Sequence, residues 1–350
     1  MNNTTAISTP LIACLESFLS PTLPTTAPVN PDTPALDLLP PATLSKLKNL
    51  GHARIRDMRA LGHTTQILSH LPVSATPQTC SKLNDALDAA TRMQSDKMVA
   101  LALLPSREGE GKEAARELQR CVTKLKFVGG VVVVGNGLAD QSFEDLWGMA
   151  QKFGVPIVLR EGWPTGAEIA ECTQGFPRTA IAPLIMNLHT AHTASPMPIL
   201  RLYLDGVFDR YPSLRLVIAH QGTLSSLLPR IDAVLASIPS TDKPKRGFLD
   251  VWQHNFYLTT ADILDLSSMR MLLEQIPMDR VLYASNYPLE ERGGNLMMEL
   301  KGSGFLTEEE WERLAWRNAH HLFKLSKPEP GPYGANTRIV ARPGQHVLLA

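Results

Sequence analysis

The sequence lacks an excess of charge of either sign, and it lacks any long apolar run. Its 350 residues include 34 Lys plus Arg and 34 Asp plus Glu, so its formal net charge is zero. Proteins that bind nucleic acids or anionic membrane surfaces usually carry a basic surface, which this composition does not supply. No apolar stretch approaches the roughly 20 residues that a membrane-spanning helix requires. We therefore expect no nucleic-acid partner and no membrane partner.

Cysteine is scarce, and its spacing excludes the common cysteine motifs. The four cysteines stand at positions 14, 80, 121 and 172, far apart and without a CxxC pair. Scattered thiols of this kind are typical of a reducing compartment rather than of a disulfide framework. Residues 1–20 have no basic residue ahead of their short apolar stretch, unlike a signal peptide. These features predict a cytoplasmic protein.

Short apolar runs alternate with amphipathic segments along most of the chain. Such runs, too short for helices, suit strands that are buried on both faces of a parallel sheet. We predict eight strands, at residues 11–15, 64–68, 98–104, 128–134, 155–159, 214–219, 255–260 and 280–285. We predict helices between and after them, at residues 42–61 with a break near Gly51, and at residues 78–95, 113–125, 142–153, 198–211, 224–236, 266–276 and 307–323.

Eight strand–helix repeats favour an α/β fold in which the sheet closes into a (β/α)8 TIM barrel. A doubly wound open sheet is the alternative, but it usually has a glycine-rich phosphate loop after its first strand, and none is present here. We assign residues 1–325 to the barrel and residues 326–350 to an irregular C-terminal extension. The proline-rich residues 21–41 are predicted to form an extended loop at the barrel mouth.

Three of the predicted strands lead directly into a polar residue: Arg160, His220 or Asn286. The C-terminal ends of barrel strands meet at one mouth, where the chemistry of such proteins takes place. A guanidinium there can hold a carboxylate or an enolate, and a histidine can both accept and donate a proton near neutral pH. Asn286 can orient a carbonyl group. We therefore predict that these three residues are catalytic.

Each of these residues also has a purely structural interpretation. Arg160 could form an ion pair with Glu161 that fills a cavity, because buried charge is costly without a partner. His220 could be a core histidine that hydrogen-bonds to the backbone. Asn286 could simply fill space.

Several motifs resemble the amidohydrolase-related family, in the branch of aminocarboxymuconate-semialdehyde and aromatic-acid decarboxylases. In chain order they are RDMRALG at 56–62, GVFDRYPSLRLVIAHQG at 206–222, DRVLYASNYP at 279–288 and RNAHHLF at 317–323. The resemblance covers most of residues 11–325. It implies a TIM barrel, a small-molecule substrate and a homodimer.

Members of that family usually hold one divalent metal ion, commonly zinc, at the barrel mouth. The positions that match its ligands read Leu15 and Ser17 on the first strand, Arg160 on the fifth and Asn286 on the eighth, whereas the family's acid–base histidine is matched by His220. Zinc requires three or four nitrogen, sulfur or carboxylate ligands, which these residues do not offer. We therefore predict that no metal ion is bound. Glu16 and His70 lie near strand ends, but a register shift would be needed to recruit them.

A further set of residues forms candidate walls of a substrate site. Each of them has plain packing or solvent exposure as its alternative role. They are Trp163, His189, His192, Tyr257, Thr259 and Ser17.

The leading hypothesis is a metal-independent lyase, or a cyclase or isomerase, of secondary metabolism. It would act on a small oxygenated carboxylate, aromatic or polyketide-like, by proton transfer from His220, with charge stabilisation by Arg160 and Asn286. One alternative is a metal-dependent decarboxylase or hydrolase of the family, with one zinc or manganese ion. Amide hydrolysis normally needs a metal-bound hydroxide, so the hydrolase stands behind the lyase. The third hypothesis is a non-catalytic barrel that binds a metabolite or a partner protein.

Overall fold

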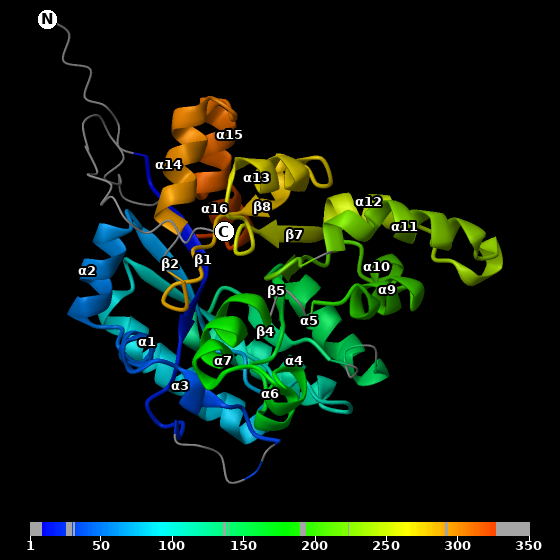
Figure 1. Cartoon of the computed structure of the whole chain (residues 1–350). Helices are drawn as coiled ribbons and strands as arrows, with labels where there is room; N and C mark the ends of the chain where they lie inside the picture. The colour runs from blue at the N-terminus through cyan, green and yellow to red at the C-terminus, as the bar shows by residue number, and fades with distance from the viewer. Residues whose placement is uncertain are drawn as a thin grey trace, which may run out of the picture.

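The computed structural model describes residues 9–25, 30, 32–135, 138, 140–189, 194–222, 224–290 and 293–326. Its centre is a parallel sheet of eight strands in the order β1 to β8 (Figure 1). The Cys14 N–H donates to the Tyr283 C=O at 2.8 Å, which joins the first strand to the segment that continues the last one. The predicted (β/α)8 TIM barrel is confirmed. The proposed C-terminal extension lies almost entirely outside the described residues, so the domain boundary stays a prediction.

All eight strands occur where the apolar runs predicted them, with ends that differ by a few residues. The strands are β1 (Ile12–Phe18), β2 (Thr65–His70), β3 (Met98–Leu103), β4 (Gly130–Val133), β5 (Ile157–Arg160), β6 (Leu216–Ile218), β7 (Phe256–Thr259) and β8 (Val281–Leu282). Almost every strand residue is buried, because both faces of the sheet are covered.

The helices include several that the periodicity did not predict. The first predicted helix is two helices, because the chain is extended at Gly51. The unforeseen helices are α6 and α7 after β5, α12 before β7 and α14 after β8. The α-helices are α1 (Pro41–Lys48), α2 (His52–Ala60), α3 (Pro77–Thr91), α4 (Gly111–Arg120), α5 (Glu144–Phe153), α6 (Gly166–Cys172), α7 (Arg178–Leu184), α9 (Met197–Leu204), α10 (Val207–Arg210), α11 (Leu224–Ser237), α12 (Phe248–Asn255), α13 (Leu266–Leu273), α14 (Gly293–Ser303), α15 (Glu308–Glu312) and α16 (Asn318–Leu322).

The inside of the barrel is a packed apolar core. Side chains from alternate positions of the strands, such as Ile67, Leu101 and Val158, meet there and are fully buried. Leu322 and Phe323 at the end of α16 pack onto the same cluster. Each such side chain contributes about 1.5–3 kcal/mol when it leaves water. This core forms a solid floor, so polar side chains at strand ends can meet only above it, at the mouth.

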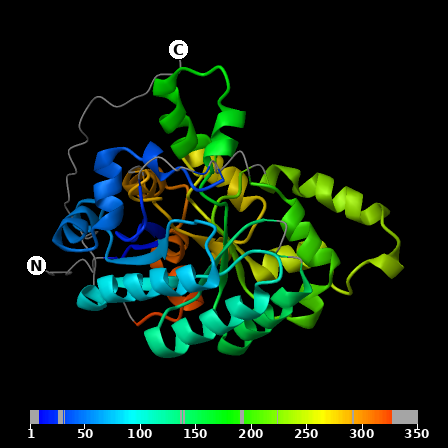
Figure 2. The same cartoon turned by 90° about the horizontal axis from the view of Figure 1, so that it is seen from below.

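One wall of the mouth joins two segments that are far apart in the sequence. The proline-rich loop after β1 meets the segment after β5, where the Ala35 N–H donates to the Pro164 C=O at 3.0 Å. The indole N–H of Trp163 donates to the Ala35 C=O, also at 3.0 Å. Helices α6 and α7 follow, and Figure 2 shows them in green, projecting beyond the barrel. The described part of the proline-rich loop therefore lies at the mouth, as the sequence predicts.

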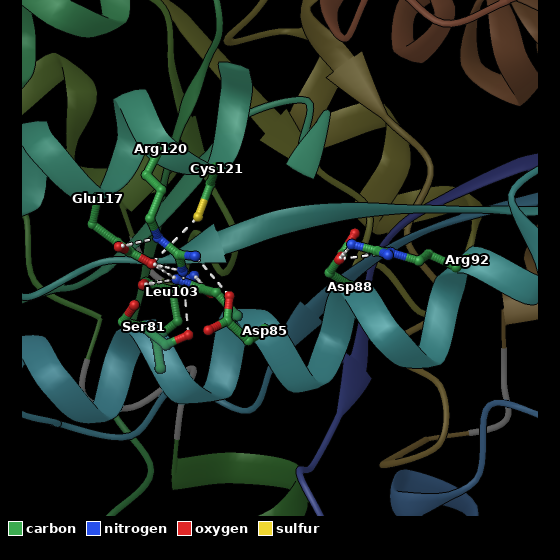
Figure 3. Close-up of polar contacts among 9 residues, drawn as sticks. Ser81, Asp85, Asp88, Arg92, Leu103, Glu117, Arg120 and Cys121 are labelled. Carbon is green, nitrogen blue, oxygen red and sulfur yellow. Dashed lines mark hydrogen bonds and ion pairs between the residues drawn. The ribbon is translucent and has the colours of Figure 1, made fainter. Parts of the chain in front are cut away.

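A polar cluster pins the end of β3 to helices α3 and α4. Asn84 pairs with both backbone groups of Leu103, donating to its C=O at 2.9 Å and accepting from its N–H at 2.8 Å. The buried carboxylate of Glu117 accepts a further bond from Asn84 at 2.7 Å. Figure 3 shows Glu117 and Arg120 facing Asp85 across the two helices. Hydrogen bonds therefore connect the C-terminal end of β3 to α3 and, through Asn84, to α4.

We predict that Asn84→Leu lowers the free energy of unfolding by about 1–3 kcal/mol, because it removes both bonds to the buried backbone groups of Leu103 and one of the bonds to Glu117. Urea unfolding followed by circular dichroism measures the change. The matched control is Asp85→Ala on the same helix, whose side chain is 57% exposed and whose ion pair with Arg120 is worth at most about 1 kcal/mol. Equal effects of the two substitutions would contradict the assignment.

Candidate active site

A cavity opens at the C-terminal ends of the strands and brings the three predicted catalytic residues together. Residues from the ends of β5, β6 and β8 line it, together with residues of the loops around them. The lining consists of Leu71, Pro72, Arg160, Glu161, Gly162, Trp163, Met186, Asn187, His220, Asp262, Asn286, Leu289 and Glu290.

Arg160 is a buried cation at the end of β5. Its side chain donates to the Ser69 hydroxyl at 2.6 Å and to the Ser17 hydroxyl at 3.4 Å. Burial lowers the pKa of Arg160 to about 10, against the opposing effect of the nearby Glu16 charge, so the guanidinium remains charged at neutral pH. These contacts replace the ion pair with Glu161 that the structural interpretation expected. Two serines therefore hold the cation in place without neutralising it.

A bulge in β1 decides which side chains of that strand face the mouth. The register shifts between Ala13 and Glu16, and Leu15 has a φ of +63°, a conformation that a leucine rarely adopts. This shift turns Glu16 sideways toward the segment after β8. There it accepts bonds from the Ser285 N–H at 2.9 Å and the Tyr287 N–H at 2.6 Å. The register of β1 does shift, but the shift places the carboxylate of Glu16 against backbone N–H groups and not toward a metal site.

His70, a nearby imidazole at the end of β2, is committed to backbone groups in the same way. His70 uses one ring nitrogen on the Leu71 C=O at 2.8 Å and the other on the Ser20 N–H at 3.0 Å. Burial lowers the pKa of His70 to about 4 and raises that of Glu16 to about 7, the latter against its hydrogen bonds and the charge of Arg54. Among the described residues, no group of three or more His, Cys, Asp or Glu is placed to hold a metal ion. The cavity instead holds the buried guanidinium of Arg160, a group that repels a cation.

His220 forms a dyad with Asp262. Its Nδ1 lies 2.7 Å from one carboxylate oxygen of Asp262, and the other oxygen accepts from the Gly222 N–H at 3.1 Å. Burial raises the pKa of Asp262, but the bonds from His220 and from backbone N–H groups outweigh it and hold that pKa below the usual value. Asp262 is therefore ionised and keeps the proton on Nδ1. Nε2, on the far side of the ring, is the nitrogen available to a substrate.

Asp262 was not among the predicted site residues, although a sequence signal for it exists. It follows the end of β7 at Thr259 by three residues, so the strand-end argument used for the other strands applies to it as well. Thr259 positions the turn, since its hydroxyl donates to the Ala219 C=O at 2.5 Å and accepts from the Ala261 N–H at 3.2 Å. Thr259 thus connects the loop of Asp262 to the end of β6 and is not among the residues that line the cavity.

Asn286 lines the cavity, and the backbone conformation at this position also favours asparagine. Its φ of +57° lies in the left-handed region, which asparagine tolerates better than most residues. Its C=O accepts from the N–H groups of Leu289 and Glu290 at 2.9 and 3.0 Å. Asn286 therefore shapes the turn after β8, whatever its side chain does for a substrate.

The remaining predicted residues are divided between the mouth and other places. Trp163 lines the cavity, and Ser17 contributes through its bond to Arg160. Tyr257 is not brought to the mouth: its hydroxyl accepts from Arg280, which precedes β8, at 2.5 Å. His189 ends a short π-helical turn, Ile185–His189, but its side chain lies outside the described residues, as does the whole of His192.

Glu161 adds to the cavity a carboxyl group that is not among the predicted site residues. Glu161 follows Arg160 and is only partly exposed at the mouth. Burial raises the pKa of Glu161 to about 7. The site therefore combines a fixed cation, a histidine–aspartate dyad and a carboxyl group that changes its charge near neutral pH.

A search of family models places residues 51–325 in a single family, described as Amidohydrolase. The chain belongs to the amidohydrolase family. It is 30% identical to Decarboxylase orsB of Emericella nidulans over 299 residues, which cover 81% of this chain and 88% of the relative. It is 29% identical to the gamma-resorcylate decarboxylase of a Polaromonas species over 312 residues, which cover 82% of this chain and 91% of that protein.

The solved structures agree with these relatives. A dihydroxybenzoic acid decarboxylase from Polaromonas, crystallised with manganese and the inhibitor 2-nitroresorcinol, superposes with a TM-score of 0.73 at 27% identity, covering 92% of this chain and 99% of that one. The predicted resemblance to the aromatic-acid decarboxylase branch is confirmed, and these relatives are carbon–carbon lyases. None of the described helices has the length and apolar character needed to cross a bilayer. The predicted homodimer and cytoplasmic location stay predictions.

We predict that the affinity for a small aromatic carboxylate falls roughly tenfold as the pH rises through about 7, because ionised Glu161 repels a second anion in the same cavity. Below that pH Glu161 is neutral, so its own repulsion of the bound anion is absent. Calorimetric titration with benzoate measures the effect, and Glu161→Gln should remove it. Phenol, which is neutral throughout this range, serves as the control ligand. A benzoate profile that is unchanged in Glu161→Gln would exclude this role.

Proposed function

We propose that this protein is a metal-independent lyase that decarboxylates a small hydroxylated aromatic acid. The observation that carries the proposal is the buried guanidinium of Arg160, which two serines hold in the same cavity as the His220–Asp262 dyad. The relatives named as aromatic-acid decarboxylases support the reaction class. The buried cation at the mouth and the hydrogen bonds that already occupy Glu16 and His70 support a reaction that proceeds without a metal ion.

Arg160 binds and orients the substrate carboxylate in this proposal. The two serines accept from two of the five N–H donors of a guanidinium, so donors remain for a pair of carboxylate or hydroxyl oxygens. A guanidinium offers its donors as a planar fork that matches a carboxylate, and its low exposure strengthens the attraction. Trp163 supplies an apolar wall for the ring.

His220 supplies the proton. Its imidazolium form donates the Nε2 proton to the ring carbon that carries the carboxylate. The bond between that carbon and the carboxylate then breaks, its electron pair returns to the ring, and carbon dioxide leaves. Asp262 stabilises the imidazolium, and solvent returns the proton to His220. General acid catalysis of this kind accelerates a reaction by about 10²–10⁴-fold, and fixed charge at a developing oxyanion adds about 10²–10³-fold.

A hydroxyl group beside or opposite the carboxylate makes this step feasible. It pushes electron density onto the carbon that is protonated, which lowers the barrier before the protein contributes anything. A cyclase or isomerase would use the same acid and the same cation on a different carboxylate. The aromatic relatives favour decarboxylation among these lyase-type reactions.

The second candidate is the metal-dependent decarboxylase of the same family. The manganese in the Polaromonas structure favours it. It would require a cation to bind beside Arg160 without Glu16 and His70, which are committed to backbone groups. A metal cation and the guanidinium of Arg160, both shielded from water in one cavity, would repel each other strongly. We therefore place this candidate second.

We predict different kinetic effects for the two main residues. His220→Asn should lower kcat about 10²–10⁴-fold with little change in KM, because it removes the acid and leaves the binding cation. Arg160→Met should raise KM as well, because it removes the group that holds the carboxylate. Steady-state kinetics with 2,4-dihydroxybenzoates measure both. His254→Asn, at an exposed histidine of α12, is the control. A folded His220→Asn variant with the wild-type kcat would disprove the mechanism.

We also predict that activity does not depend on a divalent metal. Purified protein should contain much less than one equivalent of zinc or manganese by elemental analysis, because no group of three or more His, Cys, Asp or Glu among the described residues is placed to hold such an ion. Dialysis against a chelator should leave kcat/KM unchanged, and added manganese should not raise it. One bound equivalent, with activity lost on its removal and regained on its return, would establish the metal-dependent alternative.

A further inference from the structure

The bulge in β1 decides which side chain of that strand stands beside the buried guanidinium of the mouth. Before the bulge, Ala13 pairs with Gln66 of β2. After it, Ser17 pairs with Ser69, the other serine that holds the guanidinium. If the first register continued, Glu16 would lie opposite Ser69. Because paired residues of adjacent strands face the same side, a carboxylate would then face the mouth in the place of a hydroxyl.

A second buried arginine, Arg54 of α2, holds the bulged strand from the helix side of the sheet. Its side chain is 1% exposed. It donates to the Ser17 C=O at 3.0 Å and to the side-chain oxygen of Gln66 at 2.7 Å. Its guanidinium lies over the ring of Tyr287, 4.5 Å from the centroid, and the Tyr287 N–H is one of the groups that bind Glu16. Arg54 therefore contacts β1, β2 and the segment after β8 at once.

The charge of Glu16 acts on both buried arginines. Burial lowers the pKa of Arg54 and that of Arg160 to about 10, and the nearby charge of Glu16 opposes this change in each. One terminal nitrogen of Arg54 has no hydrogen-bond partner within the described part of the chain. A buried cation is costly unless an opposite charge lies near it. Glu16 is therefore attracted by Arg54 on one side of the strand and by Arg160 at the mouth.

We propose that Arg54 is a positioning residue for anion binding at the mouth. Its bond to the Ser17 C=O and its attraction for Glu16 both preserve the bulge. The hydroxyl of Ser17, and not the carboxylate of Glu16, then lies beside Arg160. The guanidinium of Arg160 stays available to a substrate anion because no carboxylate of its own chain neutralises it. This inference rests on the proposed function, which assigns the substrate carboxylate to Arg160.

A purely structural role for Arg54 would have a different consequence. If Arg54 served only as a hydrogen-bond donor to two strands, its loss would loosen β1 whatever residue stands at position 16. In the proposed role, the loss of anion binding depends on the carboxylate of Glu16, so removal of that carboxylate restores binding. The two roles therefore differ in the effect of a second substitution at Glu16.

The test measures benzoate binding by calorimetry at pH 8, above the pKa of about 7 that burial gives Glu16. Arg54→Met should lower the affinity about tenfold, because it removes the cation that draws Glu16 away from Arg160. Glu16→Gln alone should bind benzoate like the wild type, since its amide oxygen still accepts from a backbone N–H. The double variant Arg54→Met/Glu16→Gln should regain the wild-type affinity.

Further variants separate charge from stability. Arg54→Lys keeps a positive charge near Glu16 and should retain most of the affinity that Arg54→Met loses. Arg54→Gln, a neutral substitution that keeps an amide donor, replaces Arg54→Met in the comparison if that variant does not fold. Asn84→Leu, which weakens the polar cluster at the end of β3, is the control for lost stability and should leave benzoate binding unchanged.

Arg160→Met distinguishes failure of this inference from failure of the proposed function. Suppose that Arg160→Met weakens benzoate binding, but the neutral Arg54 variant binds like the wild type or is not rescued by Glu16→Gln. The role of Arg54 is then overturned, and the proposed function stands. If Arg160→Met itself leaves benzoate binding unchanged, the proposed function fails and the role of Arg54 fails with it.

Discussion

The positive charge of Arg160 is the constraint on which the barrel mouth depends. A buried cation is stable only where polar groups surround it, and here the hydroxyls of Ser17 and Ser69 do so. The bulge at Leu15 makes this possible, because it directs Ser17 to the mouth and Glu16 toward the backbone after β8. The strained leucine is thus part of the support for the cation.

A fixed guanidinium changes the chemistry that a barrel of this family can perform. It can bind and orient anions, but it cannot activate water as a metal ion does. In the proposed function, the reaction therefore starts from a substrate that already tends to lose carbon dioxide, and the dyad has only to deliver a proton. An electron-rich aromatic acid meets this requirement.

Much of the fold could be predicted from the sequence, because short buried strands leave continuous apolar runs and amphipathic helices leave a period of 3.6. The strand-end argument also located Arg160 and His220 at one mouth. Helices α6 and α7 escaped prediction because they are short, lie over the mouth and bury little apolar surface. Tyr257 was misplaced as a wall candidate, because alternation along a strand does not tell which end of the barrel a long side chain points to.

By itself, the sequence determined the eight-stranded barrel and the family, and it predicts that Leu15, Ser17, Arg160 and Asn286 stand at the metal-ligand positions of that family. These are properties of periodicity and of residue type, which can be read in one dimension. Only the tertiary structure decided that Asp262 partners His220, because their contact spans 42 residues and depends on how two loops meet. The same holds for Glu16 and His70: their residue types suit a metal, and only the tertiary structure shows that hydrogen bonds to backbone groups occupy them.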